Sequence, residues 1–170
     1  MQIAYKDTIF DVKNGTKVRE LLKNEIEKSE NQIVAWRFNN EIKGLNYKLK
    51  SSGTIELIDI TEKDGMRVYQ RGLIYIVAKA FHDIYPEALI TINYQLYHSM
   101  FCEVDNLNLT EKMIEKVSKR VREIIECNLP IERKTMSKEE ASMFYEREKT
   151  LKGRFQMDLV VKKVVTLYYC

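Results

Sequence analysis

The strongest constraint on the fold is an apolar repeat at helical spacing that runs from Met66 to Tyr85. Its inward side would consist of Leu73, Ile76, Val77, Ala80, Phe81 and Ile84. Residues three and four apart share one face of an α-helix, and the residue before a proline avoids the helical region. The repeat therefore predicts one long helix with a single buried face, which ends before Pro86.

The residues ahead of this helix predict short strands around a shorter helix. Strand-like segments occupy residues 3–5, 9–12, 33–38 and 55–60, and turns are predicted at Asn14-Gly15 and at residues 39–41. Thr16 stands where an N-cap should be, ahead of apolar residues at helical spacing between Val18 and Ile26. The predicted order is ββαββ, which corresponds to one small sheet with a helix across it.

The residues after Pro86 predict a second mixture of helices and strands. Strands are expected at 88–94, 100–104, 131–136 and 160–169. Thr110 is expected to cap a second long helix, and Ser137 with Glu140 forms a capping box for a short helix through Tyr145. The inward residues of the second long helix are expected to be Met113, Ile114, Val117, Val121, Ile124 and Ile125.

Composition favours a globular protein in a reducing compartment. No apolar run approaches the roughly 20 residues that cross a bilayer, and Met1 to Asp7 lack the basic start and apolar stretch of a signal peptide. The three cysteines, an odd number at wide spacing, indicate neither a disulfide framework nor a metal site. We therefore expect a cytoplasmic location without membrane association, with Cys102 and Cys127 as small inward-facing residues.

The net charge of +3 is too small to predict a nucleic-acid partner by itself. Residues 1–65 hold 11 basic and 11 acidic residues, so the whole excess lies beyond them. Residues 147–163 hold six Lys or Arg and two acids. Such a run is more often a solvated face than a polyanion site.

Neither His82 nor His98 has a second ligand at metal-like spacing.

Asp64-Gly65 is the predicted boundary between two domains, 1–64 and 65–170. The last strand stops at Tyr168-Tyr169-Cys170 without a cap or a tail. We interpret this end as the point at which the second domain is truncated.

Trp36 and Phe38 share one face of a strand, where they could stack on bases if exposed, but we favour a place in the core.

Residues 1–62 resemble a TGS domain, the β-grasp (ubiquitin-like) module of threonyl-tRNA synthetases, certain GTPases and the SpoT proteins. The resemblance rests on the segments 14–18 and 33–40. Residues 67–141 resemble, without a gap, the editing-type domain that follows TGS in threonyl-tRNA synthetase. The residues that carry this second resemblance are Ala80, Tyr85-Pro86, Ile92, Phe101, Val104-Asp105, Leu109-Thr110-Glu111, Glu115-Lys116, Glu126, Asn128, Ser137 and Glu140-Ala141. The implied class is α+β, with a β-grasp domain followed by an α/β editing-like domain.

The resemblance also shows what is missing. Synthetases carry HxxxH on the first helix of the editing domain, whereas this chain has Arg71 and Tyr75 at those positions. A guanidinium has no lone pair for a metal, and a phenol is a poor base near pH 7. Cys170 matches the cysteine of a later Cys-x-x-x-His, whose histidine would lie beyond the sequence. We therefore predict no catalytic residue, no metal ligand and no cofactor in this chain.

The same pair of domains occurs at the start of a bacterial group that resembles uridine kinases and phosphoribulokinases, and Arg71-Gly72 with the ending 167–170 resembles that group more. The chain holds no GxxxxGK[ST] phosphate loop, so a kinase domain with ATP and Mg²⁺ would lie outside it. Our first hypothesis is a non-catalytic nucleotide- or RNA-binding region of a nucleoside kinase. The alternatives are an aminoacyl-tRNA editing hydrolase that uses Cys170 and a protein-interaction module.

Four residues recur every fourth position along the first long helix: Arg67, Arg71, Tyr75 and Lys79. Positions four apart drift by about 40° on a helix of 3.6 residues per turn, so the four share a broad face. Together with Cys170 they are the candidate binding residues for RNA or a nucleotide, with arginine contacting phosphate. The alternative is a solvated face with Tyr75 half-buried.

Overall fold

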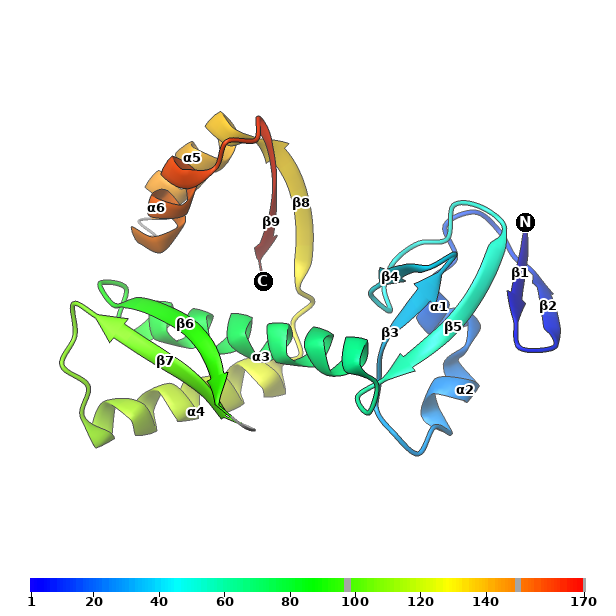
Figure 1. Cartoon of the computed structure of the whole chain (residues 1–170), viewed down its shortest axis with the longest axis horizontal. Coiled ribbons are helices and arrows are strands. Elements are labelled where there is room, and N and C mark those ends of the chain that lie inside the picture. Colours follow the sequence, from blue (N-terminus) through cyan, green and yellow to red (C-terminus); the bar gives the residue numbers. More distant parts are fainter. Residues whose placement is uncertain (97–98, 149–150, 170) are drawn as a thin grey trace. The chain divides into compact units, whose positions relative to one another are not determined.

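The computed structural model describes residues 1–96, 99–148 and 151–169. It divides into two compact units, Met1–Leu73 and Ile74–Cys170, and the division falls inside the long helix α3 (Lys63–Ile84) (Figure 1). Both units combine helices with strands, as the α+β class requires. The boundary expected at 64/65 stays a prediction. In the part of the chain that the structure describes, no helix has the length and apolar content needed to cross a bilayer.

The first unit is built on a five-stranded mixed sheet. Its strands are β1 (Gln2–Tyr5), β2 (Thr8–Asp11), β3 (Ile33–Phe38), β4 (Glu41–Lys43) and β5 (Gly53–Asp59), in the order β2-β1-β5-β3-β4. The central pair β1 and β5 is parallel, and the other neighbours are antiparallel. Two short helices, α1 (Val18–Leu21) and α2 (Lys23–Glu27), lie along one face of the sheet (Figure 1).

A small apolar core joins these helices to the sheet. Its buried members are Ile3, Tyr5, Val18, Leu22, Trp36, Leu49 and Ile55. Trp36 is fully buried, and its indole Nε1 donates to the carbonyl of Gly44 at 2.8 Å. The core position predicted for Trp36 is therefore confirmed, and this residue is not a base-stacking platform. Phe38 packs against the same core, with its ring centroid 5.5 Å from that of Trp36.

Two expectations for the first unit are wrong in detail. The helix begins at Val18 after Lys17 rather than after Thr16, because the backbone of residues 16 and 17 is bound to the 48–49 segment. The Thr16 hydroxyl donates to the Lys13 carbonyl at 2.9 Å instead of capping the helix. The helix is also divided at Leu22, whose backbone leaves the helical region. The short strand β4 was not predicted.

The second unit contains a helix pair packed on a hairpin. Strands β6 (Leu89–Leu96) and β7 (Ser99–Asp105) pair antiparallel, and α4 (Glu111–Cys127) packs with α3 against them (Figure 1). The buried core consists of Ala80, Phe81, Ile90, Val117 and Ile124.

Three residues on or near α4 that were expected to face inward are exposed instead. Ile114 and Ile125 are each 51% exposed, and Cys127 is exposed, whereas Cys102 is half-buried beside the core. The apolar stripe of α4 is wider than the face that its neighbours cover. The helix starts after Thr110 as predicted, although the Thr110 side chain makes no capping hydrogen bond.

The last elements of the second unit are a two-stranded ribbon and two helices. Strands β8 (Glu132–Ser137) and β9 (Val164–Tyr169) pair antiparallel, and the helices are α5 (Lys138–Arg147) and α6 (Leu151–Leu159). Ala141, Met157 and Leu167 form their buried core. The capping box is confirmed: Ser137 Oγ accepts from the Glu140 amide at 3.1 Å, and Glu140 Oε2 accepts from the Ser137 amide at 2.9 Å.

Helix α6 was not predicted, and the final strand starts at residue 164 rather than 160. Gly153 weakens the helical signal in the sequence, since glycine is a poor helix former. In the structure Gly153 is buried, and an added Cβ would lie 2.2 Å from the Tyr145 ring. The glycine thus allows α6 to approach α5 closely.

Candidate functional site

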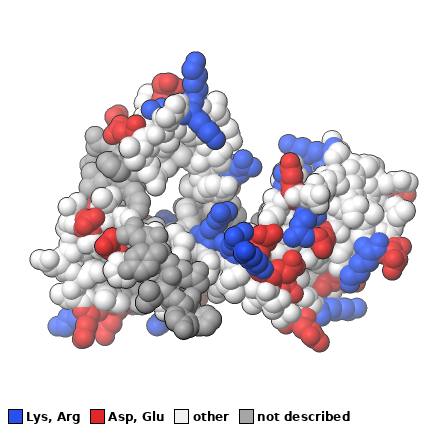
Figure 2. All heavy atoms as spheres, in the orientation of Figure 1, with Lys and Arg blue, Asp and Glu red and all other residues white. Residues whose placement is uncertain are grey.

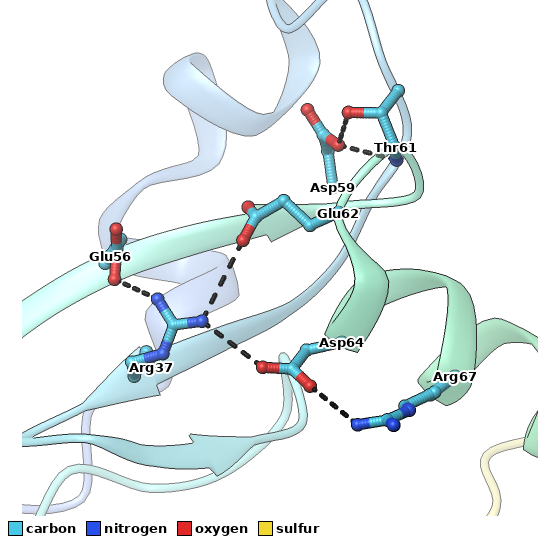
Figure 3. Close-up of polar contacts among 7 residues, drawn as sticks. All are labelled: Arg37, Glu56, Asp59, Thr61, Glu62, Asp64 and Arg67. Atoms are coloured by element: carbon cyan, nitrogen blue, oxygen red, sulfur yellow. Dashed lines mark hydrogen bonds and ion pairs between the residues drawn. The ribbon is translucent and has the colours of Figure 1, made fainter.

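The start of α3 is held by a network of charged side chains. Figure 3 shows the Arg37 guanidinium on β3 directed toward the carboxylates of Glu56, Glu62 and Asp64. The contacts to Glu62 and Asp64 measure 3.8 Å and 3.5 Å, and Glu56 accepts a hydrogen bond from Arg37. The hydrogen bond to Glu56 is the main reason that the pKa of Arg37 lies above its usual value. The network links β3 and β5 to the first turn of α3.

The turn between β5 and α3 is fixed by Asp59. Its Oδ1 accepts from the Thr61 amide at 2.7 Å and from the Thr61 hydroxyl at 2.5 Å. The hydroxyl contributes most to holding the pKa of the Asp59 carboxyl below its usual range. Gly65 lies so close to this turn that an added Cβ would be 1.7 Å from the Asp59 carbonyl oxygen. The sequence therefore needs glycine in the first turn of α3.

The four candidate residues Arg67, Arg71, Tyr75 and Lys79 lie on α3, but their surroundings differ. Arg67 contacts the Asp64 carboxylate at 3.5 Å, so it belongs to the Arg37 network (Figure 3). Lys79 pairs with Asp83 at 3.2 Å. Tyr75 is half-buried. Arg71 is exposed and forms no ion pair within residues 1–96, 99–148 and 151–169.

The three cations of this set therefore differ in whether they already have an acidic partner. Arg67 and Lys79 already have carboxylate partners, which a phosphate would have to displace. Arg71 has none in the described ranges, and its guanidinium is accessible. Arg67 and Arg71 belong to the first compact unit, whereas Tyr75 and Lys79 belong to the second. A pocket that uses all four stays a prediction.

A second charged cluster joins α3 to α4 in the second unit. The Asp83 carboxylate contacts Lys79 and receives two hydrogen bonds from the Arg120 guanidinium, at 2.9 Å and 2.8 Å. Arg120 also contacts Glu123 at 3.1 Å. Burial alone would raise the pKa of Asp83, but the bonds from Arg120 and Lys79 outweigh it and leave this pKa below its usual value. Sequence reasoning missed Arg120, because its partner is 37 residues away.

The same helix pair carries an open apolar groove of about 380 Å³. Its lining residues are Val77, Phe81, Ile114, Val117, Ser118, Val121 and Arg122. Ile114, which is exposed rather than part of the core, lines this groove. The groove holds Arg122 as its one charged lining residue among those described.

Cys170, the fifth candidate residue, and His98 lie outside the described residues. Within the described ranges, no three His, Cys, Asp or Glu side chains are grouped so as to hold a metal ion. That this chain uses no metal ion or other cofactor stays a prediction.

No family model matches the chain. It is similar to curated threonine–tRNA ligases: 31% identical over 144 residues to that of Ligilactobacillus salivarius, which is 83% of this chain and 22% of the relative. It is also 25% identical over 171 aligned positions to the ligase of Desulforamulus reducens, which is 99% of this chain and 27% of the relative. The ligase of Clostridium tetani matches with the same identity and coverage.

These relatives do not support the expected link to uridine kinases, which stays a prediction. The chain spans about a quarter of the length of the curated relatives that it matches. Over nearly all of its own length, however, the match continues through both compact units. The chain is therefore similar to one segment of the threonine–tRNA ligases.

Proposed function

We propose that this chain is a tRNA-binding region of a larger protein, formed by a TGS domain of the β-grasp type over residues 1–64 and an editing-like domain over 65–170. The observation that carries the proposal is the similarity to threonine–tRNA ligases over 99% of the chain. A ligase named for joining threonine to tRNA must bind tRNA. The proposal transfers this binding, and not the ligation, to the segment in hand.

The first unit supports the proposal through its topology. Its mixed sheet in the order β2-β1-β5-β3-β4, with β1 and β5 parallel and helices on one face, supports the β-grasp part of the proposal. The charges on the surface of this unit do not favour strong binding of tRNA by electrostatic attraction alone. Basic and acidic side chains are interspersed over this unit (Figure 2), in which 13 Lys or Arg residues stand against 11 Asp or Glu residues. Specific contacts, rather than a broad basic surface, would have to provide affinity.

Arg71 is the residue that we propose for a phosphate contact. It is exposed, and within the described ranges it forms no ion pair. A guanidinium presents paired N–H donors that match two phosphate oxygens. By the resemblance to synthetases, Arg71 and Tyr75 stand where HxxxH would be. Because this pair offers neither a metal ligand nor a base suited to neutral pH, we propose binding without deacylation.

Binding of tRNA at several salt concentrations tests this proposal. Each phosphate contact adds about 0.7 to 0.9 to the slope of log affinity against log salt, depending on strandedness. We expect Arg71→Ala to reduce this slope by about that amount and to weaken binding about tenfold at low salt. Arg19→Ala is the matched control, because Arg19 is an exposed helical arginine that forms no ion pair in the described ranges.

Two results would contradict the proposal at different levels. Equal affinities of wild type and Arg71→Ala, with equal salt slopes, would remove Arg71 from the contact. Failure of the wild-type chain to bind tRNA even at low salt would refute the function itself.

A second candidate, an aminoacyl-tRNA editing hydrolase, is favoured by the same similarity to threonine–tRNA ligases. It would need Cys170 to take part in the reaction. The test is release of the amino acid from aminoacyl-tRNA by the whole chain. Turnover that disappears in Cys170→Ala would support the hydrolase, and absence of turnover with intact tRNA binding would support the binding region.

A further inference from the structure

The ribbon of β8 and β9 has one covered and one open face. Side chains alternate along each strand, so every second cross-strand pair is on the same side. The pair Met136 and Val165 and the residue Leu167 belong to the core side. The opposite side carries Arg133 paired with Tyr168 and Thr135 paired with Thr166, and we call these four residues the ribbon face.

Three of the four residues of the ribbon face are exposed, and Thr166 is half-buried. Tyr168 is 58% exposed, and Arg133 and Thr135 are exposed as well. The hydroxyl oxygens of Thr135 and Thr166 lie 3.4 Å apart, in the middle of the face. An exposed tyrosine ring thus lies directly across the strands from an arginine, beside two hydroxyl groups. A protein core does not need this combination, whereas an aromatic ring and a guanidinium can both stack on a base.

The ribbon and the segment that leads into β9, residues 160–163, together carry a basic excess. Residues 131–137 and 160–169 contain Arg133, Lys134, Lys162 and Lys163 against one acid, Glu132. This local excess of three equals the net charge of the whole chain. No ion pair involves the four cations within the described part of the chain, and the Glu132 carboxylate accepts from the Tyr169 hydroxyl at 2.8 Å. The ribbon with residues 160–163 is therefore basic, although the net charge of the remaining chain is zero.

We propose that the ribbon face binds an unpaired segment of RNA, with Tyr168 stacked on one base and with Arg133, Lys162 and Lys163 near phosphates. This inference rests on the proposed function, because both assign RNA as the ligand. The basic charge favours a polyanion over an apolar protein surface. The ring favours unpaired bases over a duplex, because only unpaired bases expose their faces to stacking. The threonine hydroxyls add donors and acceptors for the ribose 2′-OH.

The experiment measures binding of the whole chain to a ten-nucleotide unpaired RNA, to an RNA duplex of ten base pairs and to tRNA. We expect the unpaired RNA to bind more tightly than the duplex. Tyr168→Ala should weaken binding of the unpaired RNA about tenfold, and Tyr168→Phe should retain it, since stacking needs the ring. Arg133→Gln should lower the salt slope by about 0.7. Tyr69→Ala, which removes a 40% exposed tyrosine from α3, is the matched control.

The outcomes separate this inference from the function on which it rests. If tRNA binding depends on Arg71 but Tyr168→Ala and Arg133→Gln change nothing, the ribbon face is refuted and the tRNA-binding function stands. If unpaired RNA binding depends on Tyr168 but tRNA is bound no better than other RNA, the ribbon face stands and the tRNA function fails. Equal loss in Tyr168→Ala and Tyr168→Phe would refute stacking. Displacement of RNA by an acidic peptide, with no effect of Tyr168→Ala, would indicate a protein partner instead.

Discussion

Replacement of Gly65 by alanine should destabilise the first unit strongly. Gly65 is buried in the first turn of α3, and a Cβ there would lie 1.7 Å from the Asp59 carbonyl oxygen and 3.1 Å from Ile58 Cγ2. The oxygen belongs to the backbone and cannot rotate away as a flexible side chain would. Asp59 is moreover held by two hydrogen bonds from Thr61. The turn and the helix would therefore have to move apart.

The size of this effect follows from two opposing contributions. Contacts below 3.0 Å are not tolerated, so the separation must grow by at least about 1.3 Å. Inserting a group into a closely packed site costs up to about 3 kcal/mol. Alanine is better than glycine in a helix by about 1 kcal/mol. The expected net loss is about 2 kcal/mol, or about 8 to 16 °C in the melting temperature of a unit of this size.

Urea unfolding followed by the fluorescence of Trp36, the only tryptophan in the chain and a core residue of the first unit, measures this loss. Gly72→Ala on the same helix is the matched control. No heavy atom lies within 4 Å of its added Cβ, so only the helix preference of alanine acts and stability should rise by about 0.5 to 1 kcal/mol. If Gly65→Ala were as stable as wild type, the close approach of α3 to the Asp59 carbonyl would be refuted.

Two further predictions concern the second unit. The pKa of Asp83 is depressed by Arg120 and Lys79, so its contribution is present above a pH of about 4 and is lost as the pH falls through the lower folded-state value. Asp83→Asn should therefore cost about 1 kcal/mol at pH 7 in thermal unfolding and almost nothing near pH 2, and a pH-independent cost would contradict the ion-pair explanation. Ser137→Ala should remove the cap of α5 and cost about 1 kcal/mol, whereas Ser137→Asp should largely preserve stability because aspartate also caps helices. Equal unfolding curves for wild type and Ser137→Ala would show that the bond to Glu140 contributes nothing.

Local signals predicted most of the elements correctly. The box of Ser137 and Glu140 needs only residues three apart, and the sequence therefore contains the whole motif. Pro86 marks the end of α3 for the same reason. Thr16 failed as a cap because residues 48 and 49 bind its surroundings, and this contact is not visible in a local pattern.

The candidate site was predictable as a set of positions, but only some of its contacts were. The spacing of Arg67, Arg71 and Lys79 placed them on one helix, as the structure has them. Which of these cations already has a partner depends partly on the fold, because Asp64 also reaches Arg37 and Asp83 also binds Arg120. The signal for the ribbon face was present as the excess of charge beyond residue 65, but it became specific only when β8 and β9 were paired.

The parallel pairing of β1 with β5 has a consequence for synthesis of the first unit. Residues Ile3, Ala4 and Tyr5 of β1 pair with β5, which begins at Gly53, fifty positions after Ile3. Until that segment leaves the ribosome, the nascent chain can form a hairpin and isolated helical turns but no closed core. The unit should thus mature in one late step, and a ribosome that pauses before residue 53 would hold an open, protease-sensitive intermediate.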